Sequence, residues 1–277
     1  MSQFRKIRYR LFAWRKFPQL LPSTEPIDVV IPIIAKDLHI LPLCLEGVRH
    51  CVSHPIKEVY IVAPAQQEII LFCESNQLVF VDEASVWGFS PKSLNLIIQN
   101  PDGSTRNRSG WLFQQLIKLS GKIGTCRYYL CIDADHVLIR PHIFLTNDLK
   151  TVFYMSYEEH QPYYDNIRYL LPGITLDPLS YVDHKMLFDK EQLTLLHQIL
   201  CERSGKSWID TIIDSYDRTN FAAFSEFELY GNFVQEKVRR PWLQKRLSYK
   251  KLADYETLRK KWEKSRWSLT FPEYMNK

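Results

Sequence analysis

The segment YYLCIDADHVLIRP (128–141) is the stretch that says most about the fold class. It begins with an apolar run of strand length, typical of a strand buried on both faces, and Asp133 and Asp135 follow directly. In open α/β sheets, ligands bind at the carboxyl ends of the strands. Two carboxylates at positions i and i+2 beside a turn can share a hard divalent cation. The alternative is a strand-end turn in which the aspartates only bond the backbone.

The segments before this stretch alternate between strand and helix patterns. Strands are predicted at 27–34, 58–63, 78–83 and 127–133, with helices at 37–51, at 65–75 and after a polar turn at 101–110. This alternation predicts an α/β fold, in which a mostly parallel sheet of the Rossmann type carries helices on both faces. Beyond residue 135, strands are predicted at 151–157 and 181–188, and helices at 190–202, 207–216, 224–237 and over the last forty residues.

The composition of the chain is that of an ordinary globular protein. It has 277 residues, of which 45% are hydrophobic and 24% are charged, and this excludes a collagen-like or mainly disordered chain. No apolar run reaches the length of about 18 residues that a membrane span needs, and the first residues lack the pattern of a signal peptide. The six cysteines show no CxxC pair, which predicts buried, reduced thiols in a cytoplasmic protein.

The net charge of +5 is unevenly distributed along the chain. Residues 1–17 hold six basic and no acidic side chains, and residues 237–277 hold thirteen basic and four acidic ones. The part between them holds 17 basic against 27 acidic side chains. Both basic ends interleave cations with aromatic rings, which suits an anionic membrane surface. The acidic body and the absence of a recognised module predict that the protein does not bind nucleic acid.

Several segments of the sequence resemble one family of enzymes. IDVVIPIIAKDLHILPLCLEGVR (27–49), together with the segment 128–141, looks like the nucleotide-sugar-dependent glycosyltransferases of the GT-A fold. An uncharacterised bacterial group classed with these glycosyltransferases has segments similar to SGWLFQQLIKL (109–119), VDHKMLF (182–188) and FSEFELYGNFV (224–234). The resemblance covers about residues 27–237 and implies a nucleotide-sugar donor.

The resemblance also implies a donor site around the DxD motif. Asp133 and Asp135 would hold a Mn²⁺ or Mg²⁺ ion on the donor diphosphate, and Lys36 and Asp37, in the loop after the first strand, would face the nucleotide. For Asp37, a helix N-cap is a second role that is compatible with the first. Many members of the family supply a further metal ligand from a C-terminal histidine. This sequence has no histidine after His197, so either a different residue completes the metal site or the DxD pair and the donor phosphates hold the ion alone.

The helix predicted after the polar turn carries polar residues at helical spacing. Gln114 and Lys118 lie at i and i+4 and share one face, and Gln115 has the same spacing from Trp111. Amides suit sugar hydroxyls, and a lysine suits a diphosphate. The resemblance therefore favours donor contacts for this set, with Gln114 and Lys118 foremost. The alternative is an amphipathic helix whose polar side lies in water.

Three further residues are predicted to serve the transfer step. His184, in the predicted strand 181–188, is a candidate for sugar or acceptor contact, or else a core histidine. An inverting transfer, which is the favoured reaction, needs a carboxylate that takes the proton of the acceptor hydroxyl. Glu226, directly after a Ser225 cap, is the preferred base. Glu228 is its structural partner in an S-x-x-E capping box.

The expected organisation has three parts. These are a basic N-terminal segment (1–26), a GT-A-like domain (27–237) and a basic helical C-terminal extension (238–277). Within the domain, 27–135 would bind the nucleotide and 136–237 the acceptor. The expected protein is a cytoplasmic enzyme, peripheral on the inner face of the cytoplasmic membrane. Its acceptor would be a growing cell-surface glycan, or a lipid-linked glycan.

Two other classes of protein stay open at this point. CIDADHV (131–137) also fits the first motif of haloacid-dehalogenase-type phosphatases, in which Asp133 would be the nucleophile. Those enzymes usually carry this motif on their opening strand, whereas three predicted strands precede it here. A non-enzymatic membrane-surface adaptor would depend on the two basic ends alone.

Overall fold

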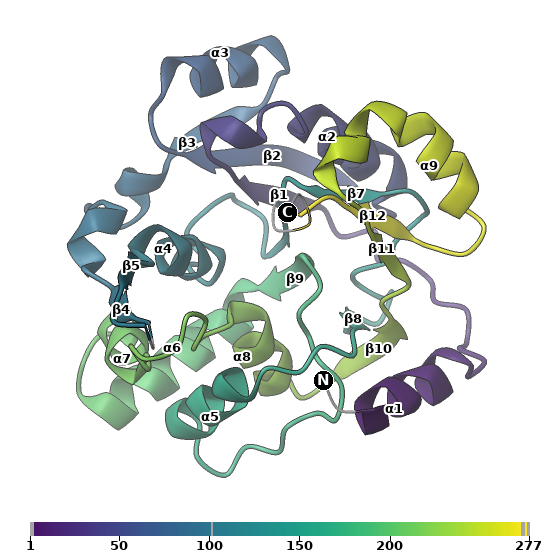
Figure 1. The fold of residues 1–277 in the computed structure, drawn as a ribbon. Coiled ribbons are helices and arrows are strands. Elements are labelled where there is room, and N and C mark those ends of the chain that lie inside the picture. Colours follow the sequence, from purple (N-terminus) through teal and green to yellow (C-terminus); the bar gives the residue numbers. More distant parts are fainter. Residues whose placement is uncertain (1–2, 101, 273–274, 276–277) are drawn as a thin grey trace.

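The computed structural model describes residues 3–100, 102–272 and 275, so small parts of both basic ends and Pro101 of the predicted polar turn lie outside the described residues. Its centre is a five-stranded sheet in the order β3-β2-β1-β6-β9 (Figure 1). The strands are β1 (Ile27–Pro32), β2 (Ile56–Ala63), β3 (Val79–Asp82), β6 (Tyr128–Ile132) and β9 (Lys185–Asp189). Strands β3, β2, β1 and β6 run parallel, and β9 is antiparallel to β6. The predicted α/β fold with a mostly parallel sheet is confirmed.

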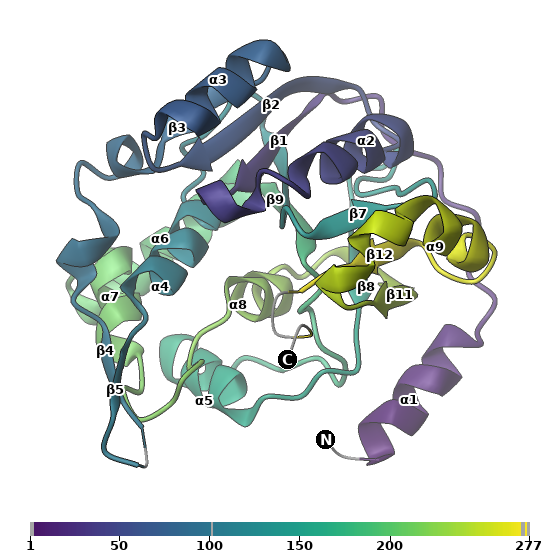
Figure 2. The ribbon, with the colours of Figure 1, turned by 45° about the horizontal axis from the view of Figure 1, so that its top comes forward.

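Helices cover both faces of this sheet (Figure 2). Val29 and Leu130 pack on the face covered by α2 (Leu41–Cys51) and α3 (Gln67–Ser75). Val30 and Tyr129 pack on the other face, which is covered by α4 (Ser109–Lys118), α6 (Lys190–Ser204) and α8 (Glu226–Phe233). Because both faces are buried, β1 and β6 read as nearly continuous apolar runs.

Shorter strands complete the fold beside the central sheet. Strand β8 (Thr151–Met155) pairs in parallel with β10 (Lys237–Pro241). Strand β7 (His136–Leu138), which follows the DxD motif, pairs antiparallel with β12 (Ser268–Thr270), and β12 pairs in parallel with β11 (Gln244–Arg246). Strands β4 (Ile97–Gln99) and β5 (Thr105–Asn107) form an antiparallel pair around the predicted polar turn.

The prediction of a helical C-terminal region over 238–277 is wrong for much of its length. Its helices are α9 (Tyr255–Trp262) and the 3₁₀ helix η4 (Tyr249–Asp254), whereas β11 and β12 are strands and β10 begins at Lys237. Strands β10 and β11 are short and rich in Lys and Arg, and β12 has only three residues, so none of them shows an apolar alternation. They form because β10 pairs with β8 and β12 pairs with β7, both far earlier in the chain, and β11 pairs with β12. The division of the chain into three parts stays a prediction.

Two other expected elements are shifted. The strand predicted over 181–188 begins only at Lys185, and the helix predicted over 224–237 ends at Phe233. The remaining helices are α1 (Gln3–Ala13), α5 (Gln161–Leu170), α7 (Trp208–Ser215) and the 3₁₀ helices η1 (Ala35–Asp37), η2 (Glu83–Val86) and η3 (Pro91–Leu94).

The six cysteines are free, and all except Cys201 are buried. Among the helices of the described residues, none combines the length and the apolar character needed to cross a membrane.

Gly47 allows α2 to approach the strand that follows the DxD motif. A Cβ atom at this position would lie 2.7 Å from the carbonyl oxygen and 2.8 Å from the nitrogen of Leu138. We predict that Gly47→Ala lowers the free energy of unfolding by about 1–3 kcal/mol, because backbone cannot move aside as a side chain can. Gly110→Ala in α4 is the matched control, since nothing lies within 4 Å of its Cβ. Thermal unfolding of the two variants tests this, and equal melting temperatures would contradict the close approach.

Candidate functional site

The DxD motif lies at the carboxyl edge of the central sheet, where β6 ends and the chain turns into β7. The backbone N–H of Asp133 donates to the carbonyl of His184 at 2.8 Å, which extends the β6–β9 pairing by one residue. The N–H of Phe271 donates to the carbonyl of Asp135 at 2.9 Å. Segments far apart in the sequence therefore meet at the motif.

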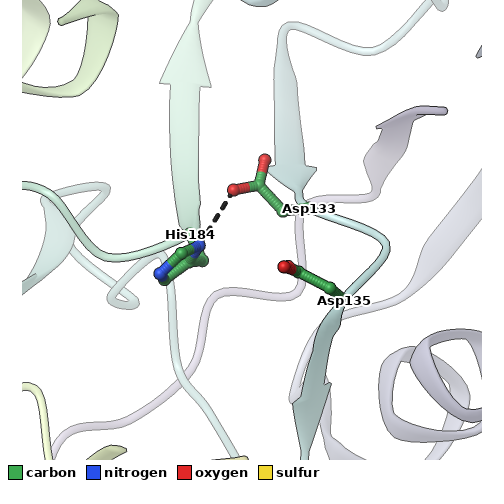
Figure 3. Close-up of side chains that lie close together, drawn as sticks. All are labelled: Asp133, Asp135 and His184. Carbon is green, nitrogen blue, oxygen red and sulfur yellow. Dashed lines mark hydrogen bonds and ion pairs between the residues drawn. The ribbon is translucent and has the colours of Figure 1, made fainter. Parts of the chain in front are cut away.

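Asp133, Asp135 and His184 form a cluster at this edge (Figure 3). Each offers one ligand atom, and these atoms all lie within 4.8 Å of one another. His184 Nδ1 lies 3.1 Å from Asp133 Oδ2. His184 precedes β9 and has a left-handed backbone with φ of 53°, so it does not lie within a strand as predicted. His184 was predicted for sugar or acceptor contact, and its place beside the DxD pair was not predicted from the sequence.

The two aspartates of the cluster differ in their electrostatics. Burial by itself raises the pKa of Asp133, but the Lys118 ammonium and the His184 imidazole hold it well below the usual range. Burial, together with the charges of Asp133 and Asp37, raises the pKa of Asp135 to about 6 against the opposing effect of His184. Asp135 Oδ1 is buried and has no hydrogen-bond partner among the described residues. An orphaned carboxylate oxygen beside a second carboxylate and an imidazole fits a divalent cation.

Lys118 is the buried cation beside this cluster. Its Nζ lies 2.7 Å from Asp133 Oδ1 and 2.9 Å from Glu226 Oε1, and its side chain is only 5% exposed. Burial lowers the pKa of Lys118, and the two carboxylates raise it by more, so the lysine is charged at neutral pH. Lys118 therefore holds Asp133 in place. The predicted contact of Lys118 with a donor diphosphate stays a prediction.

A cleft of about 450 Å³ opens beside the DxD motif. Six of the residues predicted from the sequence line it, namely Lys36, Asp37, Trp111, Gln114, Asp133 and Asp135. They come from the loop after β1, from α4 and from the turn after β6. Gln114 Nε2 donates to the carbonyl of Pro32 at 3.4 Å, which joins α4 to the end of β1. The structure thus brings these six side chains together around one cleft, and their predicted contact with a donor stays a prediction.

Asp37 shapes the loop at the mouth of the cleft. Its Oδ2 accepts a hydrogen bond from the backbone N–H of Ile34 at 3.0 Å. It does not cap the helix predicted at 37–51, because α2 begins at Leu41 and is preceded by Ile40. Burial raises the pKa of Asp37, and the charge of Asp133 adds to this effect. The loop therefore brings a third carboxylate toward the DxD pair.

Glu226 and Gln115 lie behind the cleft and do not line it. Glu226 is 4% exposed, and Lys118 occupies its Oε1. With the Gln115 amide oriented to satisfy both of its atoms, its nitrogen donates to Glu226 Oε2 at 2.9 Å and its oxygen accepts from Trp111 Nε1 at 3.3 Å. The predicted proximity of Gln115 and Trp111 is confirmed. The base role of Glu226 stays a prediction.

Glu228 lies deeper in the protein than Glu226. The predicted Ser225 cap is confirmed, because Ser225 Oγ accepts from the N–H of Glu228 at 3.3 Å. The Glu228 carboxylate itself accepts from Ser180 Oγ at 2.5 Å and from Tyr164 Oη at 3.3 Å. Burial raises the pKa of Glu228 to about 7. Its contacts are those of a buried structural carboxyl between α8 and α5.

The raised pKa of Glu228 predicts a pH-dependent stability. The unfolded chain ionises this carboxyl from about pH 4.5, whereas the fold keeps it protonated up to about pH 7, so its contribution is lost as the pH rises through that window. We predict that the melting temperature of Glu228→Gln, relative to the unmodified protein, rises by a few degrees between pH 5 and pH 8. Glu202→Gln, at an exposed position, is the control. A difference that is independent of pH would refute the prediction.

The C-terminal region contributes side chains to the surroundings of the cluster, and the sequence pattern did not predict them. Arg246 of β11 forms an ion pair with Glu158, and its guanidinium lies 3.4 Å from His184 Nε2. His136 stacks on His184 and bonds Thr270 of β12 at 2.7 Å. Arg246 lies in a run of basic residues, and nothing in the local pattern marks which of these side chains points inward. The sequence therefore does not predict these contacts.

The comparisons with solved structures identify the fold. Mouse xyloside xylosyltransferase 1, in its apo form, is similar with a TM-score of 0.51 and 11% sequence identity, over 91% of this chain and 99% of that one. The galactosyltransferase LgtC in complex with donor and acceptor sugar analogs has a TM-score of 0.47 and 12% identity, over 88% of this chain and 87% of that one. A comparison with curated proteins finds no match.

The mostly parallel sheet, the helices on its two faces and the similarity to mouse xyloside xylosyltransferase 1 define a GT-A-type fold. Residues 24–268 match a family described as a family of unknown function (DUF6492). The chain belongs to this family. The bacterial group that the sequence resembled stays a prediction.

Proposed function

We propose that this protein is a metal-assisted glycosyltransferase that moves a sugar from a nucleotide-sugar donor to a glycan, which we expect to be a cell-surface or lipid-linked glycan. The single observation that carries the proposal is the Asp133–Asp135–His184 cluster at the carboxyl edge of the sheet, beside a cleft of about 450 Å³. This is the edge at which open α/β sheets bind ligands. The GT-A-type fold supports the same assignment.

The donor set of the cluster supports a divalent cation. Asp133, Asp135 and His184 would hold the ion, with His184 in the place of the C-terminal histidine that this sequence lacks. Carboxylates suit Mg²⁺ and Mn²⁺ alike, whereas an imidazole nitrogen suits transition metals, so we favour Mn²⁺. When bound, the ion supplies positive charge that offsets the developing charge of a diphosphate leaving group.

The residues of the chain have separate tasks in this proposal. Lys118 keeps Asp133 ionised and fixed, so the cluster is ready to bind a cation. Asp37 and Lys36 face the nucleoside and its phosphates from the loop after β1, and Gln114 and Trp111 bound the cleft from α4. A cleft between two fixed walls limits the positions that a donor can adopt, which lowers the entropic cost of the transfer step.

The phosphatase alternative is less well supported. It requires Asp133 to attack a phosphate ester as a free nucleophile. Asp133 is instead bonded by Lys118 at 2.7 Å and by His184 at 3.1 Å. The motif also follows β6, which lies inside a sheet with β1 as its neighbour and is not the opening strand.

A thermal-shift screen of nucleotide sugars, with and without Mn²⁺, tests the proposal. A bound donor at about 100 times its dissociation constant stabilises the protein by about 2.7 kcal/mol, so we expect an increase of roughly 5 °C with the correct donor and Mn²⁺ together. Phosphate esters serve as the comparison set. A shift with phosphate esters and none with any nucleotide sugar would contradict the proposal.

Glu226→Gln separates two roles for Glu226. The base role requires Glu226 to reach the cleft from behind it, and it predicts that turnover falls at least about 100-fold while the donor-induced thermal shift is kept. If Glu226 only positions Lys118, the variant loses Mn²⁺-dependent donor binding as well, because the lysine no longer has a fixed partner. The comparison of turnover with the thermal shift measures both outcomes.

A further inference from the structure

The helix α1 presents an apolar stripe that no other part of the described chain covers. Phe4, Ile7, Leu11 and Trp14 recur at helical spacing and lie on one face, with exposed fractions of 84%, 52%, 61% and 87%. Phe4 and Trp14 are the two most exposed large apolar side chains among the described residues. Large apolar groups that gather on one exposed face mark a site of interaction.

The opposite side of α1 fixes the orientation of this stripe. The backbone N–H of Leu243 donates to Tyr9 Oη at 3.3 Å, and the Tyr9 ring meets Tyr157 edge to face at 5.3 Å. The guanidinium of Arg5 lies 4.9 Å from the centre of the Tyr164 ring. Since Arg5 and Tyr9 attach α1 to the body, the stripe is held outward and does not rotate into the core.

Positive charge surrounds the stripe. Residues 1–17 contain six basic and no acidic side chains. Within the described residues, none of these six side chains takes part in an ion pair with an acidic side chain. At helical spacing, Arg8 and Arg10 fall on opposite flanks of the stripe. An apolar face between two cationic flanks complements an anionic, amphipathic surface.

A groove of about 950 Å³ runs along the stripe, between α1 and the body. Ile7 and Leu11 line it from α1, and Leu176 and Leu179 line it from the body. Arg8 also lines it. The groove thus combines apolar walls with cations, and the carboxylates of Glu159 and Asp177 also line it.

We propose that the outward face of α1 docks this protein on an anionic lipid bilayer, with Phe4, Ile7, Leu11 and Trp14 entering the headgroup region and the flanking arginines contacting lipid phosphates. The occupant is a bilayer rather than a folded partner because a stripe with cations on both flanks matches a surface of uniform negative charge. The inference is independent of the proposed function, since none of these residues belongs to the DxD cluster or its cleft.

Sedimentation of the full chain with lipid vesicles tests the proposal. The vesicles are phosphatidylcholine alone and phosphatidylcholine mixed with phosphatidylglycerol, each at about 0.05 M and about 0.5 M NaCl. We expect binding to the anionic vesicles at low salt, and a loss of at least about 10-fold in affinity at high salt or without phosphatidylglycerol.

Matched variants assign the binding to α1. The double variant Phe4→Ser/Trp14→Ser and the charge reversal Arg8→Glu are each expected to weaken binding at least about 10-fold. Leu195→Ser/Ile199→Ser on α6, at apolar side chains that are 49% and 42% exposed, and Lys92→Glu, at an exposed cation, are the controls and are expected to bind normally. Circular dichroism checks that every variant is folded.

Three results would overturn the proposal. These are equal binding to neutral and anionic vesicles, normal binding by both α1 variants, and no binding to any vesicle. Self-association of the free protein that depends on Phe4 and Trp14, measured by sedimentation velocity together with an absence of vesicle binding, would assign the stripe to a second copy of this chain instead.

Discussion

Replacing Asp135 by alanine is expected to reduce sugar transfer by about 10³-fold while the protein stays folded. The loss is large because a Lewis-acid ion at a leaving group is worth several kcal/mol of transition-state stabilisation. The fold survives because Asp135 Oδ1 makes no hydrogen bond within the described residues. Its raised pKa also means that the ionised carboxylate costs stability at neutral pH, so its removal leaves the melting temperature of the metal-free protein equal or higher.

The control for this variant is Glu83→Ala. Glu83 lines the same cleft and also has a pKa raised by burial, but it lies outside the Asp133–Asp135–His184 cluster. We expect it to retain far more transfer activity than Asp135→Ala. The measurement is the initial rate of nucleoside diphosphate release with saturating donor and acceptor. A turnover near that of the unmodified protein in Asp135→Ala would show that the DxD pair does not serve the reaction.

Replacing Lys118 by methionine is expected to have the largest effect on stability. The ammonium lies between Asp133 and Glu226 in a nearly fully buried position, and methionine keeps the size of the side chain while removing its charge. The buried Glu226 carboxylate then has no cation and Asp133 keeps only His184, and breaking a buried ion pair typically costs about 3–5 kcal/mol. The melting temperature should fall by roughly 10 °C.

A double variant distinguishes lost charge from lost packing at this site. Lys118→Met/Glu226→Gln removes the carboxylate that is left without a cation and should recover part of the stability, because neighbouring substitutions in one ion-pair network are not additive. Lys206→Met is the control, since its ion pair with Asp214 lies on the surface and contributes little. A fall in Lys118→Met no larger than in Lys206→Met would contradict the role given to Lys118.

The sequence predicted those parts of the site that depend on residues close together in the chain. The apolar run of β6 and the two aspartates after it lie within eight residues, so the strand and its carboxylates can be recognised together. The loop with Lys36 and Asp37 follows β1 in the same way. Because β1 and β6 are parallel neighbours, their carboxyl ends meet at one edge, and the cleft between them follows from the topology.

The parts that the sequence did not predict depend on contacts between distant segments. His184 joins Asp133 because β9 pairs antiparallel with β6, and the register that sets Ile132 opposite Lys185 brings the next two residues together. No local pattern fixes that register. The sequence predicts helix at the short strands β11 and β12 because pairing, of β12 with β7 and of β11 with β12, makes them strands rather than an alternation of side chains.

The most direct test of the central claim is pulsed electron paramagnetic resonance of Mn²⁺ bound to the protein in the presence of a nucleoside diphosphate. Asp133, Asp135 and His184 are expected to hold the ion, so the spectrum should contain a coupling to one histidine nitrogen. That coupling should disappear in His184→Ala, and stoichiometric binding should be lost in Asp135→Ala. The account would be contradicted if Mn²⁺ binds without a nitrogen coupling, or if it binds to His184→Ala and Asp135→Ala as well as to the unmodified protein.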